Sequence, residues 1–412
     1  MGSYFEERRE KVSDKDFEPL SVTMQGILPR LETAAKTDDG DNRKLVKKND
    51  FVINSRSDRK GSAGVSSLTG SVSLISTVLT PRGIVPEYAH HLLRSQPFQE
   101  EYYRFGKGIV ADLWSTNYSE MKNIVIPSPS QDEQRAIAKF LDDETAKIDT
   151  LIEKQQQLIQ LLKEKRQAVI SQAVTKGLNP NAKMRDSGVE WLGEVPEHWD
   201  VPRISYFARV KNGSTPSREN LSYWDSADIP WITSGALNDV HINSASEFIT
   251  EKALAECSIE IISRGAVLVG LVGQGRTRGL SAMLNIDATI NQNVCAVMPD
   301  TSRLMSEFLH FFLQCAYEPL RDFGRGGNQA ALNCELVSDL RITLPSLSEQ
   351  HTIVSYLKKA LPKFEIAEQE MSLAQRLLQE RRTALISAAV TGKIDVRDWV
   401  PPVSDHRSED AV

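Results

Sequence analysis

Two segments rich in basic residues have the composition of a site that holds phosphate groups. The segment Arg43–Lys60 contains seven Lys and Arg residues against two Asp residues, a local net charge of +5. The segment Val272–Gly279 places two arginines among three glycines. Glycine lets backbone N–H groups approach a phosphate closely, and an arginine fork can hold a phosphate or the O6/N7 edge of guanine. The two segments therefore predict contacts with nucleic acid.

A second pair of loops repeats this combination of cation and glycine. Phe105–Gly108 is Phe-Gly-Lys-Gly, and Phe323–Gly326 is Phe-Gly-Arg-Gly, which continues into Gly-Asn-Gln. Asn and Gln can read adenine. The residue types do not separate base contacts from phosphate contacts, and a solvated turn is the alternative for each loop alone. The candidate nucleic-acid-binding residues are Arg56, Arg59, Lys60, Lys107, Arg276, Arg278, Arg325, Asn328 and Gln329.

The sequence contains no recognisable catalytic motif. A phosphate-binding loop of the form G-x-x-x-x-G-K-[ST] is absent, and the seven histidines form no zinc-binding pattern. The pair Pro401-Pro402 lacks the polar and aromatic neighbours expected for methyl transfer to an exocyclic amine. The residues therefore indicate no catalytic, cofactor or metal site, and they count against an ATP motor and a zinc enzyme.

Composition describes an ordinary globular protein of several domains. The chain has 412 residues, of which 40% are apolar and 25% charged, and its net charge is −6. This acidic balance excludes a uniformly basic surface but allows a local basic face. No apolar stretch of 18 residues predicts a membrane span, and the first residues do not resemble a secretion signal. Four singly placed cysteines favour a cytoplasmic protein with reduced thiols.

The chain is an internal repeat. Gln134–Thr175 aligns without a gap on Gln350–Thr391, with 14 identities in 42 positions, ten of them in the last 15. Upstream, the Phe-Gly-basic-Gly loops correspond to each other, and Asp50–Ile53 corresponds to Ala266–Val269. The chain is therefore predicted to hold two copies of one module, each a mixed segment followed by a helical segment.

The helical segments have an amphipathic pattern. Apolar residues recur every three or four positions from Ile148 to Ala173, and no Gly or Pro occurs between Asp142 and Lys176. Pro362 occupies the position of Ala146, which predicts a helix start there and hence a short helix followed by one of about 30 residues, roughly 45 Å long. We expect the two long helices to pack antiparallel around an approximate two-fold axis. The alternative is that each packs only on its own domain.

The mixed segments predict two globular domains of the α/β or α+β class. Short Val, Ile and Leu runs broken by Gly, Ser, Asn and Asp indicate strands at 50–54, 70–79, 228–234 and 293–297. One helix per module is expected, at 87–94 and 306–314. The predicted organisation is a first globular domain (1–130), a first helical spacer (131–180), a second globular domain (181–346), a second helical spacer (347–399) and a flexible tail (400–412).

Several motifs resemble one known family. Gly188–Trp199 resembles the segment that opens a target-recognition domain, and Gly213–Arg218, followed by Tyr223-Trp224 and Pro230–Gly235, is similar to its next hallmark. Leu344–Gln350 and Ile126–Gln134 resemble the entry to the family's helices, and Ala389–Val396 resembles its C-terminus. In this order the motifs resemble the DNA-specificity subunit of a type I restriction–modification system.

This resemblance implies two target-recognition domains that each read half of a bipartite site in double-stranded DNA, with the helices as spacer. It implies that the subunit has no catalysis and docks two modification subunits, which use S-adenosylmethionine. Through them it would hold restriction subunits that use ATP and magnesium. The target bases, the spacer length and the oligomeric state stay open. The rival interpretations are a helical adaptor that never binds DNA and a cryptic nuclease.

The first copy departs from the family pattern. It has no counterpart of Gly188–Trp199 or of Gly213–Arg218, and Asp16–Val22 aligns roughly with Asp228–Thr233. About 40 residues that usually begin the first domain are therefore expected to be missing. A late start codon or a shortened sequence would explain this. Whether the first domain is complete and binds DNA is left open by the sequence.

Overall fold

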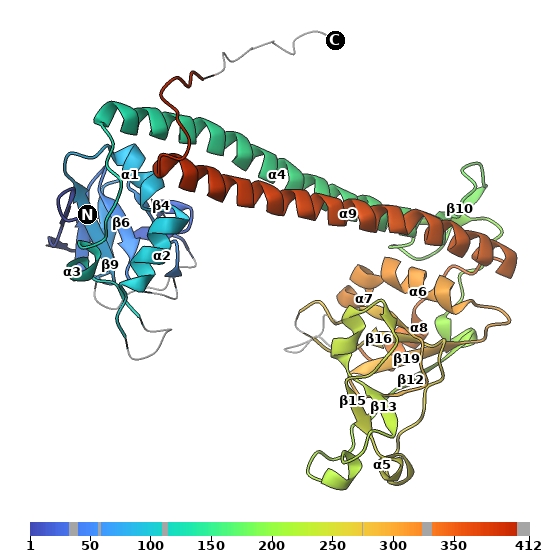
Figure 1. Ribbon diagram of the computed structural model, residues 1–412. Helices are drawn as coiled ribbons and strands as arrows, with labels where there is room; N and C mark the ends of the chain where they lie inside the picture. The colour runs from blue at the N-terminus through green and yellow to red at the C-terminus, as the bar shows by residue number, and fades with distance from the viewer. Residues whose placement is uncertain (33–39, 57–58, 109–113, 274, 324–331, 402–412) are drawn as a thin grey trace. The chain divides into compact units, whose positions relative to one another are not determined.

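The computed structural model describes residues 1–32, 40–56, 59–108, 114–273, 275–323 and 332–401 (Figure 1). The chain divides into two compact units. Unit 1 comprises Met1–Gln157 and Met371–Val412, and unit 2 comprises Leu158–Glu370. Each unit contains a mixed domain of strands and helices, together with parts of two long helices. The predicted fold class, two α/β or α+β domains with long paired helices, is confirmed.

The main sheet of unit 1 has four antiparallel strands. Three further strands form a second sheet, and two form a hairpin. In spatial order the main sheet is β1 (Phe5–Glu7), β9 (Ser76–Pro81), β6 (Phe51–Asn54) and β7 (Ala63–Val65); the second sheet is β2 (Lys11–Val12), β5 (Arg43–Val46) and β8 (Gly70–Val72); the hairpin is β3 (Leu20–Thr23) and β4 (Gly26–Pro29). The helices are α1 (Pro86–Leu92), α2 (Gln96–Arg104) and α3 (Tyr118–Met121). Phe51, Leu79, Tyr88 and Tyr102 are fully buried between the main sheet and these helices.

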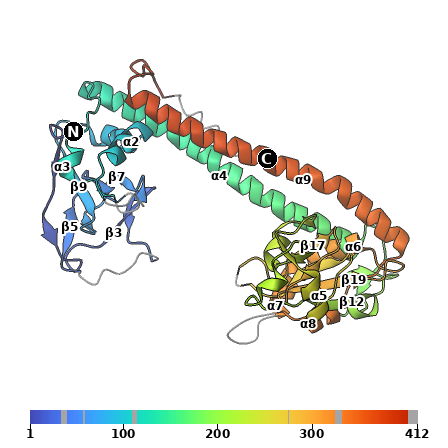
Figure 2. The same cartoon turned by 60° about the horizontal axis from the view of Figure 1, so that its bottom comes forward.

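Unit 2 repeats this plan with additions. In spatial order its main sheet is β12 (Ala208–Asn212), β19 (Val294–Pro299), β16 (Val267–Gly270), β17 (Ser281–Leu284) and β14 (His241–Ile242); a second sheet is β15 (Glu247–Ile249), β13 (Ile229–Ile232) and β18 (Thr289–Ile290); a hairpin is β10 (Met184–Asp186) and β11 (Glu194–Pro196). The helices are α5 (Glu251–Glu256), α6 (Ser306–Cys315), α7 (Tyr317–Phe323) and α8 (Cys334–Asp339). Figures 1 and 2 show α6 between the main sheet and the long helices of this unit.

The strand order confirms that the two domains are copies. The order β1-β9-β6-β7 in unit 1 matches β12-β19-β16-β17 in unit 2. A parallel bridge joins Pro19 to Ser71, and a parallel pair joins Trp231 to Thr289. These two contacts are equivalent, so Asp16–Val22 does correspond to Asp228–Thr233. The predicted helices at 87–94 and 306–314 are α1 and α6, but the expectation of one helix per module was wrong. Helices α2 and α3 also occur in unit 1, and α5, α7 and α8 also occur in unit 2.

The long helices are continuous, which corrects the expected division at Pro362. Helix α4 is Gln131–Lys176 (46 residues), and α9 is Leu347–Val390 (44 residues) with Pro362 inside it. At 1.5 Å per residue these helices are about 69 and 66 Å long. Proline removes one helical hydrogen bond. The helix continues because its flanks are held: Leu357 and Leu361 are buried in the core of unit 2, and Lys358 pairs with Glu307 at 2.5 Å.

Within each unit the two long helices run antiparallel. In unit 1 the start of α4 lies beside the end of α9, and Arg382 donates two hydrogen bonds, of 2.7 and 3.1 Å, to Asp149. In unit 2 the end of α4 lies beside the start of α9, and Arg166 is 4.0 Å from Glu365. A shift of 216 residues converts Asp149 to Glu365 and Arg166 to Arg382. The predicted antiparallel pairing is therefore confirmed within each unit.

The long helices also pack on the domains, as the alternative interpretation expected. Pairing of the helices and packing on the domains therefore occur together. In unit 1, Ile137 and Leu141 of α4 and Ile386 and Ala389 of α9 are buried in the domain core. In unit 2 the same positions, shifted by 216, are buried: Ile353, Leu357, Ile170 and Ala173. Each domain thus rests on the start of one helix and the end of the other.

A buried glutamine joins each long helix to its domain. In unit 2 the Gln350 side chain accepts a hydrogen bond from the Met305 amide (2.8 Å) and donates to the carbonyls of Arg303 (3.0 Å) and Pro345 (2.9 Å). In unit 1 the equivalent Gln134 accepts from the Val85 amide (2.8 Å). Val85 and Met305 are the N-cap residues of α1 and α6, so this side chain satisfies a helix end that would otherwise be buried without a partner.

Replacing Gln350 by alanine should leave an amide and two carbonyls of unit 2 without this partner. We expect Gln350→Ala to lower the free energy of unfolding by about 1–3 kcal/mol, the usual cost of unpaired buried polar groups. Differential scanning calorimetry of the full chain measures this as a lower midpoint. The matched control is Gln379→Ala on the exposed face of α9. Equal midpoints for the two variants would contradict the assignment.

Helices α1 and α6 each carry a histidine at an equivalent position. His310 on α6 is buried, with Nδ1 3.2 Å from the Ser281 hydroxyl and Nε2 2.7 Å from the Gln314 amide nitrogen. Its counterpart on α1 is His90, whose Nδ1 accepts from the Val65 amide at 3.2 Å. Burial, followed by the nearby positive charges, lowers the pKa of His90 to about 3 and that of His310 to about 4. Both rings are therefore neutral in the folded protein near pH 7.

This neutral histidine predicts a loss of stability in mild acid. The unfolded chain takes up a proton on His310 below its ordinary pKa of 6.5, while the folded chain does so only near 4. Stability should therefore fall as pH drops from 6.5 toward 4, by up to about 1.4 kcal/mol per pH unit for one histidine. Urea unfolding across this range should be less pH-dependent in His310→Asn than in the exposed-site control His351→Asn. Identical pH profiles would refute this role for His310.

Candidate nucleic-acid interface

In unit 1 the structure brings together candidate residues that are far apart in the sequence. Arg56 follows β6, and its backbone forms an antiparallel bridge with Ser115. The other edge of Ser115 pairs with Lys107, with N–H···O distances of 3.0 and 3.1 Å. The basic loop after β6 and the Phe-Gly-Lys-Gly loop therefore lie side by side, with one residue between them.

The other basic side chains of this region are on its surface. Arg59 and Lys60 are exposed, and the Lys60 ammonium is 4.9 Å from the centre of the Tyr103 ring. Lys107 pairs with Glu120 at 3.2 Å while most of its side chain remains exposed. Exposed ion pairs contribute little to stability. Lys107 could therefore exchange this carboxylate for a phosphate at low cost.

Part of the basic segment 43–60 has a structural role that its composition did not indicate. Arg43 is buried, and its guanidinium donates to the Ser71 hydroxyl (2.8 Å) and to the Ser71 carbonyl (3.1 Å). Lys44 donates to the Ser76 carbonyl at 2.7 Å. Burial lowers the pKa of both side chains. These two cations hold β5 against β8 and β9, so they are not part of the exposed basic surface.

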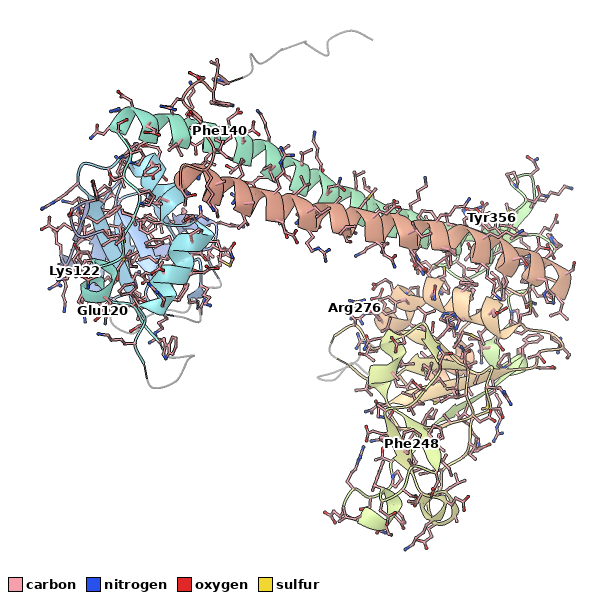
Figure 3. The ribbon with its side chains drawn as sticks, viewed as in Figure 1. Glu120, Lys122, Phe140, Phe248, Arg276 and Tyr356 are labelled. Carbon is pink, nitrogen blue, oxygen red and sulfur yellow. The ribbon has the colours of Figure 1, made fainter. Side chains whose placement is uncertain are left out.

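In unit 2 the two candidate arginines have different surroundings. Arg276 is exposed and lies at the periphery of unit 2 beside α7 (Figure 3). Arg278 is half-buried, and its guanidinium is 3.4 Å from the carbonyl oxygen of Arg321. Arg276 is therefore the more accessible of the pair. The candidates Arg325, Asn328 and Gln329 lie outside the described residues.

Two groups that sequence reasoning missed lie next to these loops. Arg321 on α7 donates to the carbonyls of Gly275 (2.9 Å) and Arg278 (3.1 Å), and Tyr317 donates to the carbonyl of Arg276 (2.8 Å). The available signal was a Tyr and an Arg four residues apart, in a helix that ends at the start of the Phe-Gly-Arg-Gly loop. That helix was not predicted, so the two residues were not singled out.

The motif Gly213–Arg218 has a structural explanation. A Cβ on Gly213 would lie 1.8 Å from the carbonyl oxygen of Ile290, so only glycine fits where the chain leaves β12. The Arg218 guanidinium lies 3.8 Å from the centre of the Trp224 ring and 5.0 Å from that of Trp231, and it pairs with Glu247 at 2.5 Å. This stacked arginine organises the aromatic cluster beside the second sheet of unit 2.

The described residues contain neither a metal-binding cluster nor a membrane-spanning helix. Among them, no group of three or more His, Cys, Asp and Glu side chains could hold a metal ion. In the same part of the chain, no helix combines the length and the apolar character needed to cross a membrane.

Comparison with known proteins connects this arrangement to one family. Residues 196–373 match the family described as the type I restriction modification DNA specificity domain. The specificity subunit of the Escherichia coli type I restriction enzyme EcoR124I/EcoR124II is 25% identical over 282 residues, covering 66% of this chain and 62% of that one. The MjaIX specificity subunit of Methanocaldococcus jannaschii is 32% identical over 171 residues, covering 40% and 38%. The matches therefore span less than two thirds of either relative.

Solved structures share the fold. A chain from a study of complex assembly and conformational transition in the type I restriction–modification system superposes with a TM-score of 0.71 and 16% identity, covering 95% of this chain and 98% of that one. The HsdS subunit of Thermoanaerobacter tengcongensis superposes with a TM-score of 0.52 and 17% identity, covering 95% and 96%. The likeness extends over nearly the whole chain.

Proposed function

We propose that this chain, which belongs to the specificity subunits of type I restriction–modification systems, binds double-stranded DNA at a bipartite site and has no catalytic step of its own. One observation carries the proposal. In each unit, two neighbouring strands of the main sheet, β6 and β7 or β16 and β17, are joined by a loop with exposed basic side chains. Two copies of one DNA-contacting loop suit a site with two halves.

In the proposed mechanism each loop contacts one half-site. Arg56, Arg59, Lys60 and Lys107 serve the first domain, and Arg276 serves the second together with Arg278, Arg325, Asn328 and Gln329. Ammonium and guanidinium groups would neutralise phosphates, while Arg, Asn and Gln are suited to base edges in the major groove. The long helices would fix the separation of the half-sites at one or more turns of the duplex.

Arg276→Ala tests the DNA contact directly. We expect weaker binding to a random 40-base-pair duplex and a shallower dependence of log K on log salt, by about one unit, because one phosphate contact is lost. Fluorescence anisotropy at several salt concentrations measures both quantities. Arg264→Ala is the matched control, because it also removes one exposed arginine but lies before β16, at the opposite end of that strand from the loop.

Two outcomes of this titration would contradict the proposal. If Arg264→Ala weakened binding as much as Arg276→Ala, net charge alone would explain the loss. If the unmodified chain gave no salt-dependent binding, the chain would be a helical adaptor that does not contact DNA. Cleavage of the duplex by the chain with Mg²⁺ would instead indicate a cryptic nuclease.

We also propose that the helix pair docks two modification subunits. Leu161 on α4 and Leu377 on α9 are equivalent by the 216-residue shift, and they are 58% and 52% exposed. Two exposed leucines at equivalent positions could each contact one of two copies of the same partner. S-adenosylmethionine, ATP and magnesium would belong to the partner subunits, including the restriction subunits that join through the modification subunits. The cytoplasmic location stays a prediction from the cysteine pattern.

Introducing one charge at one of these leucines should remove one partner. We expect Leu161→Asp or Leu377→Asp to bind one modification subunit in place of two, because a carboxylate cannot be buried in an apolar contact without a partner. Light scattering on the purified complex reports the stoichiometry. Gln160→Asp introduces the same charge on a neighbouring exposed position and should leave two copies bound. Two copies on both leucine variants would contradict the assignment.

A further inference from the structure

The Gly-rich loop of unit 2 is held by the side chains of one helix. Between β16 and β17, the carbonyl of Gly275 accepts from Arg321 (2.9 Å), that of Arg276 from Tyr317 (2.8 Å) and that of Arg278 again from Arg321 (3.1 Å). Arg321 also lies 3.1 Å from the Tyr317 hydroxyl. Three carbonyls within four residues are thus bound by two side chains of α7.

The backbone of the loop approaches α7 closely at Gly279. Its φ is +83°, which favours glycine, and an added Cβ would lie 3.2 Å from the Tyr317 carbonyl oxygen and 3.3 Å from Cγ of Arg321. Gly279 donates its N–H to the Gly270 carbonyl at 2.9 Å, which closes the base of the loop. Contact with α7 therefore extends from Gly275 to the end of the loop.

In unit 1 the side chains of the equivalent helix, α2, also contact the basic loop, but through a different kind of hydrogen bond. Tyr103 on α2 and Arg321 on α7 each precede the Phe of the Phe-Gly-basic-Gly loop by two residues. The Tyr103 hydroxyl accepts from the Gly61 amide at 3.2 Å, and an added Cβ on Gly61 would lie 3.5 Å from the Gln99 side chain. A side chain at one repeated position thus contacts the basic loop in both copies, although one accepts from an N–H and the other donates to carbonyls.

We propose that Arg321 and Tyr317, and Tyr103 in the first copy, are positioning residues that hold the two basic loops in the conformation that contacts DNA. Arg321 is half-buried and its guanidinium is directed to loop carbonyls, so it acts through Arg276 and its neighbours. A loop fixed before binding loses less conformational freedom on the DNA, which strengthens selective contacts. The inference rests on the proposed DNA-binding function for its purpose, but the clamp itself can be tested without DNA.

The first experiment measures loop opening by limited trypsin digestion of the full chain. Trypsin cleaves after Arg276 and Arg278, and only in a locally opened loop. We expect Arg321→Lys, which keeps the charge but loses the fork, to speed this cleavage about tenfold, the scale of one lost hydrogen bond to a charged group. Tyr317→Phe should act in the same direction, and Tyr103→Phe should speed cleavage after Lys60. Arg303→Lys is the matched control, because Arg303 stacks on Phe207 away from the loop.

The second experiment measures selectivity as a ratio of two affinities for each variant. The first is the affinity for duplexes that the unmodified chain has enriched from a random pool, and the second is the affinity for the unselected pool. We expect Arg321→Lys and Tyr317→Phe to reduce this ratio about tenfold with an unchanged salt slope. A preserved ratio in both variants, or cleavage rates equal to those of the Arg303→Lys control, would overturn the inference. A reduced salt slope in Arg321→Gln with a normal ratio in Arg321→Lys would make Arg321 a direct phosphate contact, which also overturns it.

The two experiments separate the clamp from the proposed function. If the unmodified chain bound no DNA, the proposed function would fail, while the digestion would still decide whether α7 and α2 hold the loops. Calorimetry on each variant confirms that the domains are folded. Tyr317→Phe removes a single oxygen atom, so it keeps the inference testable even if an Arg321 variant unfolds.

Discussion

The burial of helix ends under the two domains is the constraint on which the rest of the structure depends. A two-helix pair in water can cover only a narrow stripe of apolar side chains, and a small mixed sheet needs a cover on its helical side. Both needs are met where the long helices pack on a domain. Ile137 and Ile386 are buried in the core of unit 1, and Ile353 and Ile170 are buried in the core of unit 2. The middle of the pair lacks this cover, and there Leu151 and Leu158 are 48% and 43% exposed.

Repetition made most of the fold predictable. The gapless match of Gln134–Thr175 to Gln350–Thr391 predicted two long helices, and buried Val, Ile and Leu runs predicted β6, β13 and β19. The helix start predicted at Pro362 was wrong, because this proline lies inside α9. The energy of one missing hydrogen bond is smaller than that of the buried leucines beside it, so tertiary packing decided the outcome.

The candidate site was less predictable, since charge in a sequence does not reveal the direction of a side chain. Arg43 and Arg56 belong to the same basic segment, yet Arg43 is bound to Ser71, 28 residues away, while Arg56 is exposed. Lys107 is joined to Arg56 through Ser115, a contact that depends on the path of the chain between them. Long-range pairings of this kind are set by the folded backbone and have no local signal.

The two units are completed at different times during synthesis, because unit 1 is built from two separate segments of the chain and unit 2 from one. Unit 2 is one continuous segment, whereas unit 1 needs residues 371–390 of α9, which leave the ribosome last among the long helices. Until that segment arrives, Ile137 and Leu141 lack Ile386 and Ala389 as neighbours. The N-terminal domain, although made first, therefore completes its core last. Loss of the last turns of α9 would consequently expose apolar surface at the opposite end of the polypeptide.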